Sequence, residues 1–225
     1  MAVQFVQPHQ FTPEQYLRML NARIVPHASA ELVDGVVVVG MRPYRFSDED
    51  YARLGEAGIL DEDERVELVD GEIIQMTPIG ARHSTVVSRV AQLLFRLRGS
   101  REVRTQDVLL LREGFQPHPD AVLYRAPTEA YALTHPRAED ALLVVEVADT
   151  SLLYDRTLKA EHYAAAGIPE YWLVDLKRDV VLVMRQPAAS AYLDVREYRH
   201  GESWTSPALD GTEVEAATVL GPPRT

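Results

Sequence analysis

Residues 141–175 read ALLVVEVADTSLLYDRTLKAEHYAAAGIPEYWLVD, and this stretch decides the fold. Leu142 to Val147 is an almost unbroken apolar run, which is typical of a strand buried on both faces. The pattern then predicts a polar turn over 148–155, a short helix over 156–166 and a second buried strand over 171–176. A strand, a connecting helix and a second strand favour a parallel pair of strands. The stretch therefore predicts an α/β fold organised around this unit.

One acidic residue, Glu146, interrupts the first of these apolar strands. Burying a carboxylate costs free energy unless the group is paired, protonated or bound to a metal. Glu146 also lies near the carboxyl end of its strand, where open α/β sheets tend to place their binding sites. It is therefore the first candidate for a functional residue.

The composition of the chain limits the class of protein. Its 225 residues suit one domain with an extension, or two small domains. We expect a cytoplasmic protein, because no stretch approaches the roughly 18 apolar residues of a membrane span and no secretory signal is evident. The absence of cysteine excludes disulfides and thiolate metal sites. A net charge of -11 argues against tight, non-specific binding of nucleic acid by the whole surface, although it allows a local basic groove.

Two N-terminal segments, residues 11–41 and 46–76, resemble each other. Both contain the sequence ELVDG, which occupies residues 31–35 in the first copy and 67–71 in the second. Each copy begins with a helix-start signal and ends with two apolar runs around Asp-Gly, which is a strong hairpin signal. We predict a duplicated helix–hairpin unit; the alternative is two hairpins that match by chance.

A helix is predicted over residues 83–98, where apolar residues recur at helical spacing. Arg82, Arg89 and Arg96 recur every seven residues, so they share one edge of this helix. A stripe of charge on a helix is most often a solvated face, and the alternative is an edge that contacts phosphates. His83, at the helix start, either forms a local hydrogen bond or contacts a phosphate. Further strands are predicted over 103–111, 119–124, 180–185, 192–198 and 213–219.

Two carboxylates in short strands, Asp120 and Glu146, are separated by one connection, so they can be neighbours. Carboxylates that converge at strand ends make an oxygen-rich site for a hard cation such as Mg²⁺ or Mn²⁺. Such an ion lowers the pKa of a bound water and stabilises charge on a phosphoryl group. A lysine nearby would orient the nucleophile, and the 23 basic residues include only two lysines, Lys159 and Lys177.

Lys159 lies on the helix that follows Glu146, four residues after Asp155, and this spacing favours an ion pair between an acid and a base. The alternative is that each acid is a lone edge or turn residue and that Lys159 lies on a solvated helix surface. The position of the acids within apolar strands favours the metal site.

The chain also carries a series of motifs that resembles the Uma2 family of restriction-endonuclease-like proteins, which is similar to the PD-(D/E)XK nuclease superfamily. The resemblance spans about residues 44–202, and the order of the motifs is specific. The motifs are ELVDGE at 67–72, His83, Pro119-Asp120, the VVEV strand around Glu146, Asp155 with Lys159, and Tyr163-x-x-x-Gly167-x-x-Glu170-Tyr-Trp-x-Val-Asp175.

The resemblance implies a mixed sheet flanked by helices, with the N-terminal duplicate as an extension, and Mg²⁺-dependent cleavage of DNA phosphodiesters. It assigns Asp120 and Glu146 to the metal together with the carbonyl of Val147, and it matches Glu67 to the upstream glutamate that often completes such sites. One position departs from the superfamily: Ala148 stands where its lysine belongs, two residues after Glu146. In this family Lys159 is the matching position, and it would reach the site only if its helix folds back on the sheet.

The sequence therefore predicts a metal-dependent endonuclease that hydrolyses DNA. We expect a homodimer, from the way such nucleases cut two strands. Three alternatives stay open: a catalytically silent nucleic-acid-binding module on the same fold, an interaction protein that dimerises through its N-terminal hairpins, and a hydrolase of small phosphate esters. The predicted catalytic residues are Asp120, Glu146, Lys159 and Glu67, and the predicted nucleic-acid contacts are His83, Arg82, Arg89 and Arg96. The predicted parts are an extension over 1–43, a nuclease-like domain over 44–202, and a C-terminal strand and tail over 203–225.

Overall fold

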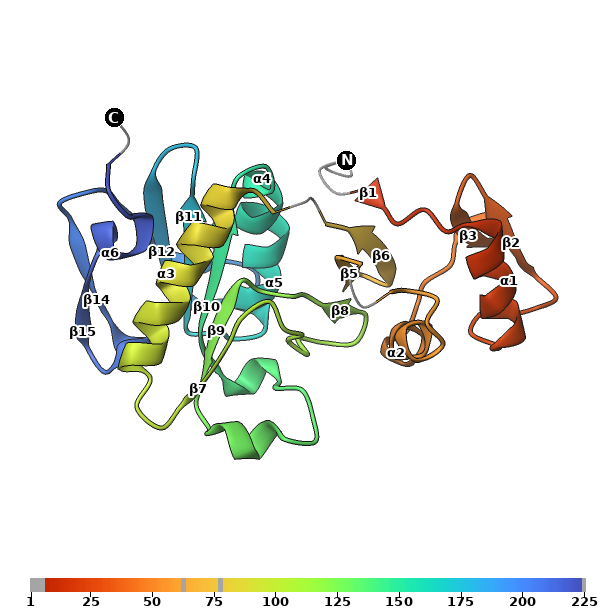
Figure 1. The fold of residues 1–225 in the computed structure, drawn as a ribbon, viewed down its shortest axis with the longest axis horizontal. Coiled ribbons are helices and arrows are strands. Elements are labelled where there is room, and N and C mark those ends of the chain that lie inside the picture. The colour runs from red at the N-terminus through yellow and green to blue at the C-terminus, as the bar shows by residue number, and fades with distance from the viewer. Residues whose placement is uncertain (1–6, 62–63, 77–78, 224–225) are drawn as a thin grey trace. The chain divides into compact units, whose positions relative to one another are not determined.

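A computed structural model describes residues 7–61, 64–76 and 79–223 (Figure 1). The chain forms two compact units. The N-terminal unit takes the described residues before 77 together with Arg112–Pro117, and the C-terminal unit takes Ile79–Leu111 and the residues from His118 onward. The first six residues of the predicted extension and the last two of the predicted tail lie outside the described residues.

The C-terminal unit is built on a six-stranded sheet in the order β13-β12-β11-β10-β9-β7. β10 and β11 are parallel, with Glu146 opposite Leu173, and the other neighbouring strands of this sheet are antiparallel. The predicted parallel pair and the predicted mixed sheet are therefore confirmed. The strands are β7 (Glu102–Arg104), β9 (Ala121–Tyr124), β10 (Ala141–Ala148), β11 (Glu170–Asp175), β12 (Val180–Pro187) and β13 (Tyr192–Tyr198).

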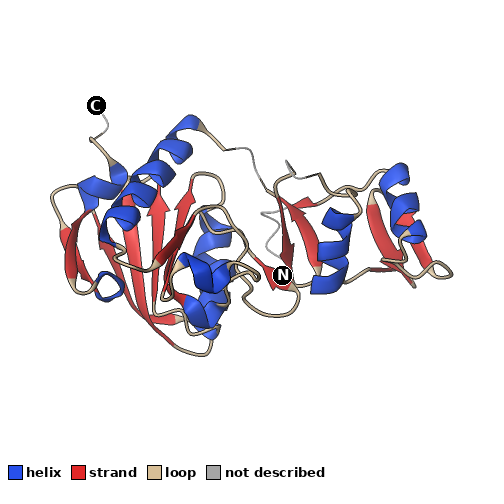
Figure 2. Cartoon of the chain, turned by 60° about the horizontal axis from the view of Figure 1, so that its bottom comes forward, coloured by secondary structure: helices blue, strands red, loops and turns tan. Residues whose placement is uncertain are grey.

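Helices cover both faces of this sheet (Figures 1 and 2). Helix α3 (Ala81–Leu97) packs with α6 (Ala216–Leu220) on one face, over a core that includes Val145, Val147 and Trp172. Because side chains alternate along a strand, Glu146 projects from the opposite face of β10. That face carries the helical connection between β10 and β11, so the alternation determines which helix meets the buried carboxylate.

The connection begins earlier than predicted. Its helical turns start with α4 (Leu152–Tyr154), continue as a π-helical turn over Asp155–Lys159, and end with α5 (Ala160–Ala165). The predicted polar turn over 148–155 was therefore too long, because Leu152 and Leu153 already belong to the helix. Gly167, in the left-handed conformation with φ +76°, follows the helix and allows the chain to turn into β11.

Two other predicted strands were partly wrong. Over 103–111 only the β7 residues form a strand, because Gln106 adopts a left-handed conformation with φ 52° and ends the extended run. Over 213–219 the strand ends at Glu215 and α6 follows, since the two alanines that come next are good helix formers. β14 (Ser203–Ser206) pairs with β15 (Thr212–Glu215) as a separate two-stranded sheet.

The N-terminal unit contains two helix–hairpin segments with matching elements. The first has α1 (Pro13–Asn21), β2 (Ala30–Val33) and β3 (Val36–Val39), and the second has α2 (Asp48–Glu56), β5 (Val66–Val69) and β6 (Glu72–Gln75). Both helices begin with a capping box, formed by Thr12 with Gln15 and by Ser47 with Asp50. The remaining strands are β1 (Gln7–Pro8), β4 (Arg42–Pro43) and β8 (Phe115–Gln116).

A contact within one segment recurs in the other, with one more residue between the partners in the second segment. Tyr16 donates a hydrogen bond from its hydroxyl to the carbonyl of Ala30, and Tyr51 donates one to that of Val66. The short strands that precede the two helices are exchanged between the hairpins. β1, which precedes α1, pairs with β6 of the second hairpin, while β4, which precedes α2, pairs with β3 of the first. The two segments share one core, to which residues at equivalent positions of each segment contribute. A common origin of the two segments stays a prediction. The core residues include the pairs Phe11 and Phe46, Met19 and Leu54, Ile24 and Ile59, and Val25 and Leu60.

Several buried tyrosines make stability sensitive to alkaline pH. Burial raises the pKa of Tyr124 and of Tyr192 above the usual value, and burial together with the charge of Glu67 raises that of Tyr51. The unfolded state then loses phenolic protons first, so this stability is complete below about pH 10 and falls as pH rises above it. We expect phenolate absorbance and loss of circular dichroism to appear together in an alkaline titration. Gradual tyrosine ionisation in a chain whose dichroism is unchanged would contradict this.

Candidate functional site

Glu146 and Lys159 form a buried ion pair on the face of β10 that carries the helical connection to β11. The Lys159 Nζ atom lies 2.9 Å from the Oε1 atom of Glu146, and the Lys159 residue is only 1% exposed. The helical connection therefore folds back on the sheet and brings Lys159 to Glu146. A buried charge of this kind requires a partner, and each residue supplies one for the other.

Two further side chains complete this cluster. Tyr163, one helical turn after Lys159, donates a hydrogen bond of 2.7 Å from its hydroxyl to the same Oε1 atom of Glu146. The Oδ1 atom of Asp155 lies 3.9 Å from the Lys159 Nζ atom, and the Oδ2 atom accepts a 2.5 Å hydrogen bond from Ser151. The sequence analysis named Tyr163 only as part of the family motif and gave it no role in the site, although its position four residues after Lys159 was a usable signal.

The π-helical turn carries Asp155 at its start and Lys159 at its end. Such turns are rare and are frequent at functional sites. The adjacent Tyr171 hydroxyl donates to the backbone carbonyl of Asp155 at 3.1 Å, which ties the turn to β11. Burial raises the pKa of Tyr171 well above its usual value, and the negative charges of Asp155 and Glu146 raise it further. Burial is therefore the main cause of this shift, and the two nearby carboxylates add to it.

Asp120 directly precedes β9, so it lies just outside the strand predicted over 119–124, beside the end of β10 that carries Glu146. The antiparallel register pairs Ala121 with Val145, so Asp120, which comes before Ala121, lies beside Glu146, which follows Val145. The Oδ2 atom of Asp120 accepts a 2.8 Å hydrogen bond from the backbone N–H of Val147 and lies 3.1 Å from Nε2 of His83. The structure thus brings Asp120, Val147 and His83 together.

Gln106 is a further neighbour of Asp120 that the sequence analysis missed. Its side-chain Nε2 donates a long hydrogen bond of 3.4 Å to the Oδ1 atom of Asp120, and its backbone N–H donates to the carbonyl of Pro119. Its left-handed backbone interrupts a stretch that reads as a continuous strand, so no local pattern identifies this contact.

The donor atoms at these strand ends suit a hard cation. Carboxylates of Asp120 and Glu146 and the carbonyl of Val147 are oxygen ligands, and Mg²⁺ typically takes one or two carboxylates while it keeps several waters. Among residues 7–61, 64–76 and 79–223, no group of three or more His, Asp and Glu side chains is arranged to hold a metal. Binding of a metal ion by Asp120, Glu146 and the carbonyl of Val147 stays a prediction.

Glu67 lies in the N-terminal unit, on β5, and is buried. Its charge contributes to the raised pKa of Tyr51, which is in the same unit. Glu31, the residue at the matching position of the first segment, is exposed on β2. The contribution of Glu67 to the catalytic group stays a prediction.

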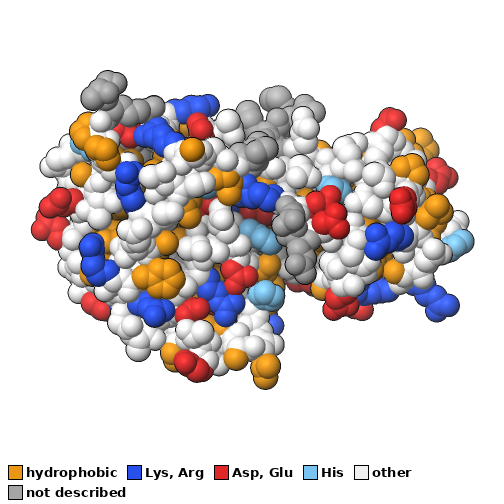
Figure 3. All heavy atoms as spheres, in the orientation of Figure 1, with side chains coloured by type: hydrophobic (Ala, Val, Ile, Leu, Met, Phe, Trp, Pro, Cys, Tyr) orange, Lys and Arg blue, Asp and Glu red, His pale blue; other side chains and the backbone are white. Residues whose placement is uncertain are grey.

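The predicted arginine edge of α3 has mixed surroundings. Arg82 donates to the carbonyl of Leu176 and pairs with Asp179 at 2.5 Å, while Arg89 donates to the carbonyl of Leu220 at 3.2 Å. Both arginines therefore support neighbouring elements of the C-terminal unit, whereas Arg96 is exposed. Figure 3 shows basic side chains scattered among acidic and apolar ones on one face. Contact of these arginines with nucleic acid stays a prediction.

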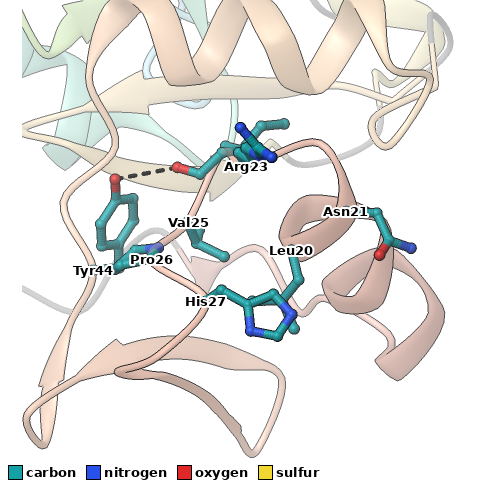
Figure 4. Close-up of a pocket in the computed structure, with 8 residues that line it drawn as sticks. Leu20, Asn21, Arg23, Val25, Pro26, His27 and Tyr44 are labelled. Carbon is teal, nitrogen blue, oxygen red and sulfur yellow. Dashed lines mark hydrogen bonds between the residues drawn. The ribbon is translucent and has the colours of Figure 1, made fainter.

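The N-terminal unit contains an open pocket of about 740 Å³ (Figure 4). It is lined mainly by the end of α1 and the turn that follows, including Leu20, Asn21 and His27. Tyr44 borders it and donates a 3.3 Å hydrogen bond to the carbonyl of Ile24. The lining carries no carboxylate and lacks the acid–lysine arrangement found on β10, so we assign no chemistry to it.

Comparison with known proteins agrees with this mixed α/β fold. A crystal structure of "a putative nuclease belonging to DUF820" from Anabaena variabilis has a similar fold, with a TM-score of 0.63 and 15% sequence identity. The match covers 76% of this chain and 96% of that one. A search of curated proteins finds no match.

The family model for Uma2, described as "Putative restriction endonuclease", matches residues 48–218. The chain belongs to the Uma2 family. This membership supports a nuclease-type function. No helix among the described residues is long and apolar enough to cross a membrane.

Proposed function

We propose that this chain is a metal-dependent endonuclease that hydrolyses DNA phosphodiester bonds. The observation that carries the proposal is the 2.9 Å contact between Lys159 and Glu146. The superfamily lysine is replaced by Ala148, and the structure brings another lysine to the glutamate from the following helix. Family membership supports the same class of reaction.

Asp120, Glu146 and the carbonyl of Val147 would hold a Mg²⁺ or Mn²⁺ ion. When bound, the ion would lower the pKa of a water and stabilise negative charge on the phosphoryl group. His83 and the Val147 N–H orient the Asp120 carboxylate through their contacts with Oδ2. Fixed partners of this kind hold a ligand in position before the ion arrives.

Lys159 would act on the attacking water and on the charge that develops in the transition state. Its ammonium group is held by Glu146 and Asp155, and Tyr163 shares the Glu146 oxygen. Removing a pre-oriented positive group of this kind lowers the rate by about 10²–10³-fold. The arginines of α3 and His83 would position the DNA backbone.

The test is cleavage of plasmid, linear duplex and single-stranded DNA, and of RNA, with Mg²⁺, with Mn²⁺ and with a chelator. We expect cleavage of DNA that requires metal and that falls by about 10²-fold or more in Asp120→Asn and Lys159→Met. Lys177→Met is the matched control, because Lys177 is the chain's other lysine and is exposed after β11. Full activity in both site variants, with their fold intact, would refute the proposal.

A second candidate is a catalytically silent nucleic-acid-binding module. It is favoured by the near-complete burial of Lys159 between two carboxylates, which also suits a purely structural ion pair. The net charge of -11 agrees with a binding surface confined to one region. This candidate predicts DNA binding without any metal-dependent product in the same assay.

A further inference from the structure

Strand β13 forms an open edge of the six-stranded sheet. In the part of the chain that the structure describes, it pairs on one side only, with β12. The other edge strand, β7, has three residues and is largely buried, and Glu102 in it bonds to Thr128 and to the carbonyl of Ala126. β13 has seven residues, four of which are exposed. A long exposed edge strand is a template for pairing with another strand.

The open edge also carries apolar side chains. Leu193 is 72% exposed and Val195 is 50% exposed, and because they are two residues apart they project from the same face. A pocket of about 480 Å³ borders Val195 and is lined by Met184 on β12 and by Ala160 on α5. Exposed apolar residues grouped beside a free strand edge indicate an interaction surface.

Charged residues on an edge strand often prevent pairing with another strand. Their arrangement on β13 therefore decides whether the strand is protected from pairing or suited to it. The strand reads YLDVREY, and Asp194 and Arg196 flank Val195 symmetrically. If two copies of β13 pair antiparallel about an axis at Val195, Asp194 of each copy lies opposite Arg196 of the other. Opposite charges in facing positions stabilise a strand pair, and the two valines face each other at the centre.

We propose that two copies of this chain associate through antiparallel pairing of β13 with β13, which joins their six-stranded sheets. The occupant of the edge is a second copy, because Asp194 and Arg196, which lie 2.8 Å apart within one strand, also present opposite charges to an antiparallel second copy. Another open hairpin edge, β2, is a weaker candidate, since it has four residues and its one charged residue, Glu31, has no basic residue in the strand to face. The association needs neither metal nor nucleic acid, so it stands apart from the proposed nuclease activity.

The first test is sedimentation equilibrium with charge-reversal variants. We expect the wild-type chain to dimerise reversibly. Asp194→Arg and Arg196→Asp should each weaken the dimer by about tenfold, because each places like charges opposite one another twice. The double exchange, Asp194→Arg with Arg196→Asp, should restore the wild-type affinity. Glu129→Arg is the control, an exposed charge reversal on the turn beside β7.

The second test uses the absence of cysteine from the chain. Val195→Cys places a single thiol at the proposed axis, where facing side chains lie close enough to form a disulfide. Oxidation should give a cross-linked dimer at low protein concentration, and Ser88→Cys on α3 should not. A monomeric wild-type chain would overturn the proposal. A dimer whose affinity is unchanged in the charge-reversal variants and that does not cross-link through position 195 would also overturn it, because its interface would lie elsewhere.

Discussion

Lys159→Met is expected to lower the free energy of unfolding by about 3–5 kcal/mol. The substitution keeps the length of the side chain but removes the ammonium group that lies 2.9 Å from Glu146. Glu146 and Asp155 are both buried, so their negative charges would lose the cation between them. Removing one partner of a buried ion pair destabilises the fold more than replacing both partners with uncharged residues, because it leaves a buried charge without compensation. Urea unfolding followed by circular dichroism measures the change.

A double-substitution cycle separates the ion pair from simple loss of packing. Lys159→Met combined with Glu146→Gln removes both charges, and it should recover most of the stability lost in Lys159→Met alone. Lys177→Met should leave stability nearly unchanged, because the residue is exposed. If the single substitution costs no more than an ordinary surface change, Lys159 does not compensate Glu146. The cycle also shows whether a loss of cleavage in Lys159→Met could result from unfolding.

The sequence alone was informative about the site because its signals are local. An acidic residue inside an apolar strand identified Glu146, and the scarcity of lysine left only two candidates for a basic partner. The structure places Lys159 against Glu146, although the sequence could not show that the helix folds back on the sheet. That arrangement depends on the π-helical turn, and no pattern in residues 155–159 distinguishes a π-helix from an α-helix.

The contacts that sequence reasoning missed are those that link distant segments. Gln106 reaches Asp120 only because its backbone turns at a position where a strand was expected. In the N-terminal unit, the repeat of ELVDG predicted two hairpins, but it did not predict that β1 and β4 are exchanged between the segments. Pairing of this kind is determined by tertiary packing, which local propensity does not encode.

Another buried glutamate, Glu170, serves as a useful contrast to Glu146. Glu170 lies on β11 and is 1% exposed. Its Oε1 atom accepts from Trp172 Nε1 at 2.8 Å and from Arg185 Nη2 at 3.0 Å, and its Oε2 atom accepts from Ser206 at 2.8 Å. Both oxygens are therefore bonded to protein donors. Glu170 links β11 to β12 through Arg185 and to β14 through Ser206, so its contacts stabilise the fold.

Glu170→Ala is expected to cost about 3–5 kcal/mol of unfolding free energy, because it leaves the partly buried Arg185 guanidinium and the Trp172 N–H without their carboxylate. Ser206→Ala, which removes one neutral donor to the same carboxylate, should cost only about 1.5–3 kcal/mol, the range for a hydrogen bond to a charged group. The measurement is urea unfolding in the absence of metal. Because Glu170 bonds only to donors of the C-terminal fold, any folded fraction of Glu170→Ala should keep metal affinity close to wild type, whereas Glu146→Ala should lose it. If instead Glu170→Ala is stable but does not bind metal, the assignment of the two glutamates is reversed, and the metal site lies around Glu170 instead of Glu146.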